Sequence, residues 1–337
     1  MAIGWGILGV GTHAENFMRP AISKVANAKL VAVCDVTMER TREFADRHGV
    51  ERAYDSFGKM LEDPDLDVLW IATPNSLHAR QTVQAAEAGK HVLCEKPMAL
   101  TIADAELMVD ACNRYKVKLG VDFQNRYHPA HVEAQRLIQS GAAGDISVAT
   151  AQFCRGFSRG FGKGWRNDPA IAGAGGLMGQ GLHPIDLLRF LMKSEVEEVR
   201  ALTDEAPPSR PVDEMDYMIF TFENGAHGVV ISGMLAPRPD NNAILYGSRA
   251  KITCKGTVGM WPQGELIVEG DNLNMNMTFP VEDPAGPDLY IRVVEDFNRC
   301  IEEDSEPNIS GYNGLQMVKI TNAVLESSRQ GKAVRIK

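Results

Sequence analysis

Gly9-Val10-Gly11-Thr12-His13-Ala14 follows the apolar run 3–8, and this short stretch decides the fold of the N-terminal third. The first glycine permits a tight turn from strand to helix, and the second lets the backbone approach a pyrophosphate. Ala14 takes the third small position, where helix and strand pack closely, and the positive helix N-terminus would meet the phosphates. The pattern predicts a Rossmann domain whose residues 9–13 contact a dinucleotide.

Asp35 closes the next apolar run and indicates which dinucleotide binds. It lies about 20 residues after Ala14, the spacing expected for a carboxylate that accepts hydrogen bonds from the adenosine ribose. This spacing favours NAD over NADP. Arg40 follows soon after Asp35 and could reach a ribose phosphate, so NADP stays an alternative.

Length and composition indicate a globular protein of two domains. The chain has 337 residues, more than the roughly 250–300 at which a single hydrophobic core stops growing. We expect a cofactor-binding domain at 1–122 and a substrate-binding and oligomerisation domain at 123–337. The formal net charge of −9 argues against a general nucleic-acid binder, because no basic stripe is present to neutralise phosphates.

Targeting signals and paired cysteines are absent from the sequence. No run approaches the roughly 18 apolar residues of a membrane span, and the N-terminal apolar run lacks the charged flank and cleavage site of a signal peptide. We therefore expect a cytoplasmic protein with no membrane partner. The six cysteines stand singly, so we expect reduced thiols, no disulfide and no metal.

The order of apolar runs predicts two different sheets. Up to residue 122 they alternate with helical patterns, which is typical of a doubly wound parallel sheet. The expected strands there are 3–8, 30–34, 68–72, 91–94 and 119–122. After His128-Pro129 come strand-like runs at 147–155, 215–223, 226–234, 243–246 and 265–269, with helices near 181–192, 289–303 and 314–330. Asn224-Gly225 marks a hairpin, so the second domain is expected to be α+β with a large, mostly antiparallel open sheet.

Ligands of a doubly wound sheet bind beyond the carboxyl ends of its strands. That rule points to the loop Thr73–His78, to Glu95-Lys96-Pro97 and to 123–126. Lys96 is the best catalytic candidate, because a partly buried lysine with a lowered pKa can exchange a proton with a substrate hydroxyl. The alternative for Lys96 is a solvated surface lysine.

A glycine-rich loop, 173–181, runs into an apolar helix that begins near His183. Dense glycine indicates close approach of another group. Asp186 lies one helical turn after His183 and could orient or charge-stabilise its imidazole. The alternatives are a capping or core role for His183 and a structural role for Asp186, and for Asp186 we prefer the structural one.

Four basic residues of this acidic chain alternate with aromatic residues. They are Arg155, Arg159, Lys163 and Arg166, interleaved with Phe153, Phe157, Phe161 and Trp165. Arginine binds carboxylate, phosphate or sulfonate with two hydrogen bonds, and aromatic faces stack on sugar or arene rings. The cluster fits a small-molecule substrate with an anionic group. The alternative is a solvated basic loop whose aromatic residues lie in the core.

Three segments together resemble the Gfo/Idh/MocA family, the glucose-fructose oxidoreductase and inositol dehydrogenase group. They are Glu95-Lys96-Pro97, the loop 72–78 and Gly181-Leu182-His183-Pro184-Ile185-Asp186. The resemblance covers essentially the whole chain. It implies a Rossmann domain followed by a domain whose open sheet forms homodimers or homotetramers, tightly held NAD(P), and oxidation or reduction of a secondary hydroxyl.

The resemblance and the glycine fingerprint together give the expected site. The family's catalytic lysine and histidine correspond to Lys96 and His183. Expected cofactor contacts are Gly9, Val10, Gly11, Thr12, His13, Asp35, Arg40, Thr73, Pro74, Asn75, His78, Glu95, Lys96, Gln124, Trp165 and Arg166. Expected substrate contacts are Lys96, Arg126, Arg155, Arg166, Gln180 and His183.

One position departs from the family pattern. Sugar dehydrogenases of the family carry an aspartate four residues before the histidine, and here that position is Gly179. Gln180 is polar but cannot act as a base. We expect an NAD(P)-dependent oxidoreductase acting on a cyclic sugar, cyclitol, sugar acid or dihydrodiol. Redox-neutral glycoside cleavage through transient oxidation at C3, and a non-catalytic NAD(P)-sensing regulator, remain alternatives.

Overall fold

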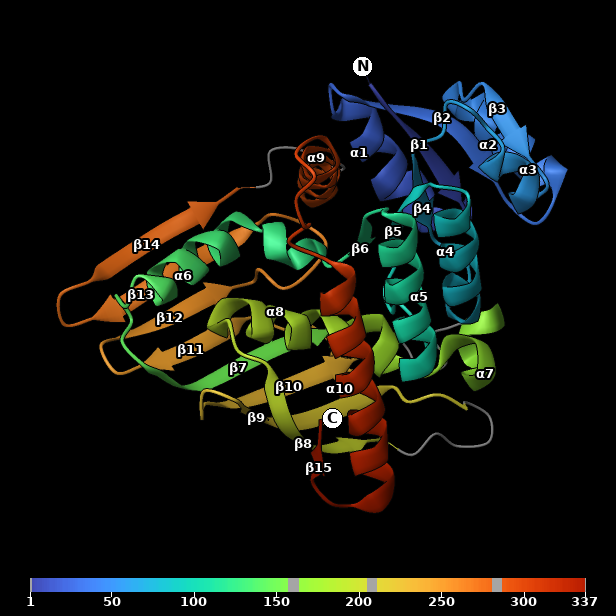
Figure 1. Ribbon diagram of the computed structural model, residues 1–337. Coiled ribbons are helices and arrows are strands. Elements are labelled where there is room, and N and C mark those ends of the chain that lie inside the picture. Colours follow the sequence, from blue (N-terminus) through green and yellow to red (C-terminus); the bar gives the residue numbers. More distant parts are fainter. Residues whose placement is uncertain (1, 157–163, 205–210, 281–286, 337) are drawn as a thin grey trace. The chain divides into compact units, whose positions relative to one another are not determined.

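The computed structural model describes residues 2–156, 164–204, 211–280 and 287–336, and its chain forms two compact units (Figure 1). The first unit comprises Met1–Asp122 and Asp283–Leu315, and the second comprises Phe123–Glu282 and Gln316–Lys337. The sequence expectation placed everything after residue 122 in the second domain. In the structure the helix α9 (Asp288–Glu302) packs into the first unit, where the Trp5 indole nitrogen donates to Asn298 Oδ1 at 3.0 Å and the Trp5 ring meets Phe297 edge-on.

The first unit contains a six-stranded parallel sheet in the order β3-β2-β1-β4-β5-β6. Its strands are β1 (Ile3–Leu8), β2 (Ala28–Cys34), β3 (Arg52–Tyr54), β4 (Val68–Ile71), β5 (His91–Cys94) and β6 (Leu119–Val121). This is the strand order of a Rossmann fold, so the predicted doubly wound sheet is confirmed. The short, half-buried β3 was not predicted, because three residues carry no recognisable alternation.

Two helices of the first unit, α2 and α5, begin at a side-chain cap. Thr101 accepts the Asp104 backbone N–H at the start of α5, and Thr37 accepts that of Arg40 at the start of α2. The helices of this unit are η1 (Ala14–Met18), α1 (Arg19–Lys24), α2 (Met38–His48), α3 (Phe57–Leu61), η2 (Asn75–Leu77), α4 (His78–Glu87), α5 (Ile102–Tyr115) and α9. Helices α4 and α5 pack side by side (Figure 1).

The second unit contains a nine-stranded sheet in the order β14-β13-β12-β11-β7-β10-β9-β8-β15. Its strands are β7 (Ile146–Cys154), β8 (Val196–Thr203), β9 (Met215–Phe222), β10 (His227–Gly233), β11 (Ala243–Gly247), β12 (Ala250–Lys255), β13 (Gly264–Gly270), β14 (Asn274–Phe279) and β15 (Val334–Arg335). Only the β7–β10 pairing is parallel among these strands as described, so the mostly antiparallel sheet is confirmed. Gly225, at φ 83°, makes the predicted hairpin turn between β9 and β10.

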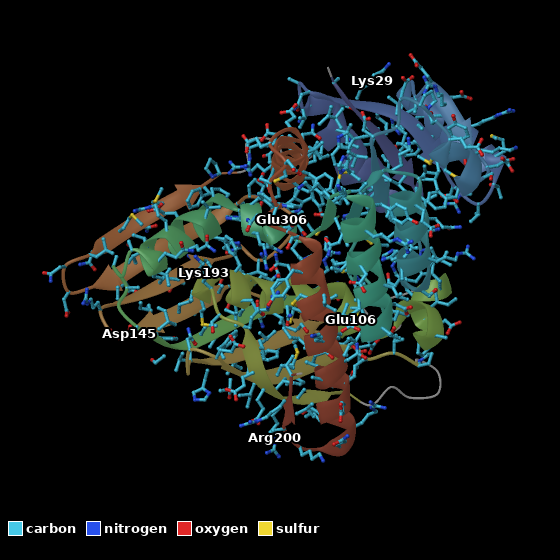
Figure 2. The ribbon with its side chains drawn as sticks, in the orientation of Figure 1. Lys29, Glu106, Asp145, Lys193, Arg200 and Glu306 are labelled. Atoms are coloured by element: carbon cyan, nitrogen blue, oxygen red, sulfur yellow. The ribbon has the colours of Figure 1, made fainter. Side chains whose placement is uncertain are left out.

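Helices cover one face of this large sheet. The described helices outside the first group are η3 (Gln124–Tyr127), α6 (Pro129–Gln139), η4 (Gly164–Asn167), α7 (Pro169–Ala172), η5 (Leu177–Gly181), α8 (Leu182–Met192) and α10 (Gly311–Gln330), which starts in the first unit. Helix α8 packs on β7 and α6 packs on β12 and β13 (Figure 1). Every residue of α8 is buried, and Lys193, labelled in Figure 2, ends the helix at φ 49°.

The other face of the sheet leaves large apolar side chains exposed. Tyr217 and Ile219 alternate along β9 with the buried Met218 and Phe220, so they point away from the helices. The exposed face, as we name it, consists of Val148, Leu202, Tyr217, Ile219, Val229 and Tyr246. These residues form directly opposed cross-strand pairs, Val148 with Tyr246, Leu202 with Tyr217, and Ile219 with Val229.

The structure also describes the helices and the cysteines for which we drew expectations from the sequence. Among the described residues, no helix has both the length and the apolar character needed to cross a membrane. All six cysteines are unpaired and buried. Burial raises the pKa of the Cys112 and Cys254 thiols to about 12, so these side chains act as packing groups at neutral pH.

Candidate active site

The glycine turn after β1 has the shape that a pyrophosphate requires. Gly9 has φ 101°, and a Cβ built there would lie 2.7 Å from the Ala72 carbonyl oxygen. A Cβ built on Gly11 would meet no atom within 4 Å, so open space lies beside the backbone at this position. Ala14 is fully buried at the close contact between helix and sheet. These features fit the roles that the sequence predicts for the three small residues.

Asp35 is tied to this turn from the end of β2. Its Oδ2 atom accepts the Val10 backbone N–H at 2.9 Å, and its Oδ1 atom accepts that of Val36 at 2.7 Å. The Arg40 guanidinium lies 3.5 Å from Oδ2 and is largely exposed. The two side chains that bear on the choice between NAD and NADP therefore sit together at one edge of the predicted site.

The side chain of His78 ties the loop after β4 to the end of β5. Its Nδ1 atom lies 2.8 Å from the Pro97 carbonyl oxygen, and its Nε2 atom lies 2.9 Å from that of Thr73. Burial lowers the pKa of His78, and the side chain has no exposed surface. The sequence placed His78 among the cofactor contacts, whereas in the structure it joins the 73–78 loop to the end of β5 and shapes both.

The end of β5 carries Glu95 and Lys96, and the Lys96–Pro97 peptide is cis. His13 Nε2 lies 3.2 Å from Glu95 Oε1. Burial alone would raise the pKa of Glu95, but His13 and Lys96 lower it below its usual value. The carboxylate of Glu95 is therefore held ionised at the point where the sheet rule places a ligand.

Asp122, just after β6, adds a second carboxyl group that the sequence did not single out. Donor atoms of His13, Glu95 and Asp122 all lie within 4.8 Å of one another, a set that could hold a metal ion. Burial, and then the neighbouring Glu95, raise the pKa of Asp122 well above its usual value. Two buried carboxyl groups this close do not both ionise. A proton on Asp122 removes the repulsion between the two groups, so the pair does not require a metal ion.

In the second unit, His183 lies at the start of α8 and is almost fully buried. Asn125, in η3, places its amide nitrogen 3.3 Å from His183 Nδ1, and the Phe153 ring packs edge-on against the imidazole. Asn125 was not singled out in the sequence, because its partner lies 58 residues away. Its position between Gln124 and Arg126 was the only signal that could have found it.

Arg126 and Asp186 form a buried ion pair in the second unit. Arg126 donates from Nε and Nη2 to the two carboxylate oxygens of Asp186 at 2.7 and 2.6 Å, and Arg189 donates to Asp186 at 3.2 Å. Asp186 therefore binds the two arginines, which agrees with the structural role preferred for it. Arg126, expected to contact substrate, is committed to this pair and is 5% exposed.

The segment before His183 is a five-residue π-helix, η5. A Cβ built on Gly179 would meet no atom within 4 Å, so the position of the family's aspartate is open space. Gln180 is buried, and its Oε1 atom has no hydrogen-bond partner among the described residues. A buried acceptor without a partner is a candidate to receive a hydrogen bond from a ligand hydroxyl.

The basic and aromatic cluster is described only in part. Arg155 stacks on Phe153 and Arg166 stacks on Trp165, with the guanidinium carbons 6.0 and 4.4 Å from the ring centroids. Arg166 is exposed and Trp165 is half-buried. Arg159, Lys163, Phe157 and Phe161 lie outside the described residues. Gln124 donates from its side chain to the Gly259 carbonyl oxygen at 3.3 Å, within the second unit.

Comparison with known proteins agrees with this geometry. Residues 3–123 match a model described as an oxidoreductase family with an NAD-binding Rossmann fold, and residues 131–253 match the GFO/IDH/MocA C-terminal domain. The chain is 27% identical to 1,5-anhydro-D-fructose reductase of Ensifer adhaerens over 98% of both chains, and 26% identical to myo-inositol 2-dehydrogenase of Thermotoga maritima over 98% of both. A solved structure of levoglucosan dehydrogenase with NADH and levoglucosan is 26% identical, with a TM-score of 0.90 and full coverage of both chains.

Proposed function

The chain belongs to the Gfo/Idh/MocA family of NAD-binding oxidoreductases, and on that premise we propose that it oxidises or reduces a secondary hydroxyl of a cyclic sugar, cyclitol, sugar acid or dihydrodiol. The observation that carries the proposal is Lys96, which follows β5 directly after Glu95 in the unit that binds NAD. Relatives named for sugar and cyclitol substrates support the same class.

The residues of the first unit fit NAD. Open space beside Gly11 admits the pyrophosphate, and Asp35 offers carboxylate oxygens to the adenosine ribose. When bound, NAD supplies the hydride-accepting C4 of nicotinamide. We propose that the turn 9–13, the loop 73–75 and Glu95 hold it, with Gln124, Trp165 and Arg166 of the second unit as further contacts.

We propose that Lys96 exchanges the proton of the reacting hydroxyl and that His183 hydrogen-bonds to substrate oxygen. Gln180 Oε1 would accept a hydrogen bond from another substrate hydroxyl, because it has no partner among the described residues. Arg155 and Arg166 suit an anionic substituent, because a guanidinium group binds carboxylate, phosphate or sulfonate with two hydrogen bonds, and the neighbouring Phe153 and Trp165 rings add aromatic faces. We give Arg126 a structural role, because Asp186 holds it.

The proposed activity is tested by following the absorbance of reduced nicotinamide. The purified protein is mixed with NAD or NADP and a panel of inositols, aldoses, sugar acids, dihydrodiols and aryl glycosides. Growth of the band with one ligand establishes a dehydrogenase and its substrate class. Release of the aryl group with a silent band establishes redox-neutral cleavage instead, which the open space at Gly179 would accommodate. If neither signal appears although NAD binds, the remaining alternative is a non-catalytic NAD(P)-sensing regulator.

Asp35 is expected to set the preference for NAD. The variant Asp35→Asn keeps an acceptor for the Val10 N–H but removes the negative charge. We expect kcat/KM with NAD to fall about 10- to 100-fold, the worth of a hydrogen bond to a charged group, and kcat/KM with NADP to rise because its phosphate is no longer repelled by Asp35 and meets Arg40. Steady-state kinetics with both cofactors measures the ratio.

The control for Asp35 is Asp46→Asn, which removes an exposed charge from α2 in the same unit. It should leave the ratio of NAD to NADP activity unchanged. A ratio that stays constant in Asp35→Asn as well would contradict the role proposed for Asp35.

We propose that the protein forms a homodimer through the exposed face of the second unit. Six exposed apolar side chains from five neighbouring strands form one contiguous surface. Contiguous apolar surfaces mark protein interaction sites, whereas single exposed apolar residues do not. Ile219→Lys, near the middle of this face, should weaken self-association at least about tenfold, since it would bury an ammonium group. Sedimentation equilibrium measures this, with Leu107→Lys on α5 as an exposed apolar control. Equal association of both variants and the parent would refute the assignment.

A further inference from the structure

The hydrogen bonds around Asn125 determine which nitrogen of His183 carries a proton. Asn125 is 2% exposed, and its side-chain Oδ1 accepts the Gly259 backbone N–H at 3.1 Å. A backbone N–H can only donate, so the oxygen of the amide must face Gly259. The NH₂ group of Asn125 must then face His183 Nδ1, 3.3 Å away.

The backbone of Asn125 is fixed as well. Its carbonyl oxygen accepts a hydrogen bond from His131 Nδ1 at 2.7 Å, and His131 Nε2 contacts the Thr257 hydroxyl at 2.8 Å. Burial lowers the pKa of His131 to about 4, so this ring is neutral and its one N–H points at the Asn125 carbonyl. Asn125 is therefore anchored at both its main chain and its side chain, and rotation of the amide would break the bond to Gly259.

An NH₂ group has no lone pair to offer, so His183 Nδ1 must accept the hydrogen bond. In the neutral ring the proton then lies on Nε2. Protonation of Nδ1 would set N–H against NH₂, which disfavours the imidazolium. Asp186, one turn further along α8, accepts hydrogen bonds from arginines at both of its carboxylate oxygens.

We propose that Asn125 is a positioning residue that holds His183 as the Nε2–H tautomer, so that His183 donates a hydrogen bond to substrate oxygen and does not act as the general base. The proton of the reacting hydroxyl then goes to Lys96 alone. This division of roles rests on the proposed function, whereas the tautomer itself does not.

The tautomer is measured directly by ¹⁵N NMR of the histidine rings in the substrate-free protein, at neutral to mildly alkaline pH, with His183→Gln assigning the signal. We expect a protonated Nε2 and an unprotonated Nδ1. A protonated Nδ1 overturns the proposal. Because no substrate is needed, this result is independent of whether the proposed activity is found.

The variant Asn125→Asp tests the consequence for catalysis. A carboxylate keeps the acceptor for Gly259 but now requires a proton on His183 Nδ1, so Nε2–H is present only in the imidazolium. The activity should fall about a hundredfold near neutral pH and recover at lower pH, where both ring nitrogens of His183 carry protons. A purely structural defect would give low activity without this new pH dependence, and that outcome overturns the proposal.

Asn242→Asp is the matched control. Asn242 also accepts a backbone N–H through Oδ1, from Gly256 at 2.7 Å, in the same unit. It should leave both the pH profile and the His183 signal unchanged. If Asn242→Asp introduces the same pH dependence, the effect belongs to added charge and the proposal falls.

Discussion

Lys96→Met is expected to lower kcat by about 10²- to 10⁴-fold, the range that a positioned acid–base group contributes. Methionine keeps an unbranched side chain of similar length but cannot exchange a proton. Binding of NADH, followed by nicotinamide fluorescence, should change far less than kcat, because the glycine turn and Asp35 stay in place. Steady-state kinetics on the substrate found in the panel measures the loss.

Lys29→Met is the matched control for Lys96. Lys29, labelled in Figure 2, lies on β2 in the same unit and is largely exposed. It pairs weakly with Glu51 at 3.8 Å. This variant should keep kcat within about twofold, since a surface ion pair contributes little. A Lys96→Met enzyme that turns over as fast as Lys29→Met would refute the assignment of Lys96. Loss of NADH binding in parallel with activity would move Lys96 to a cofactor-holding role.

Asp186→Ala is expected to lower the free energy of unfolding by about 3–5 kcal/mol, the cost of leaving a buried charge without its partner. Arg126 would lose both of its hydrogen bonds to the carboxylate, whereas Arg189 would keep Glu195 at 2.7 and 2.8 Å. Urea unfolding measures the change as a lower midpoint at a similar slope.

Two further variants make the Asp186 result specific. Asp145→Ala removes an exposed carboxylate near the start of β7 (Figure 2) and should change stability by no more than about 0.5 kcal/mol. The double variant Arg126→Met/Asp186→Leu replaces the pair by apolar groups and should recover part of the loss. If Asp186→Ala were no more destabilising than Asp145→Ala, the ion pair would not be a structural element.

Local sequence patterns were sufficient for five of the six strands of the first unit, but not for β3 or for the placement of α9. The glycine turn, the alternation of apolar runs with helices and the Asp35 carboxylate depend on neighbouring residues, so they are visible in the sequence. The Asn224-Gly225 hairpin was equally local. The unpredicted strands β3, β8, β12, β14 and β15 are short, edge-lying or rich in polar residues, and pairing with neighbouring strands rather than their own pattern makes them strands.

The candidate site shows the same division between residues found from local sequence and partners brought close only by tertiary packing. Lys96 and His183 were found from their segments and from the family resemblance, and their roles remain proposals. The partners of the candidate residues were not found. His78 is buried beneath its loop, Arg126 belongs to Asp186 across 60 residues of sequence, and Asp122 joins Glu95 only because β5 and β6 are neighbours in the sheet.

The sequence by itself therefore determined the Rossmann unit, the cofactor class and the family, because glycine conformations and apolar periodicity act within a few residues. Only the tertiary structure decided how each polar group is satisfied. A buried donor or acceptor takes whatever partner the packing brings within reach, and for His183 that partner is Asn125, whose own orientation depends on Gly259. The protonation state of the histidine follows from that chain of hydrogen bonds.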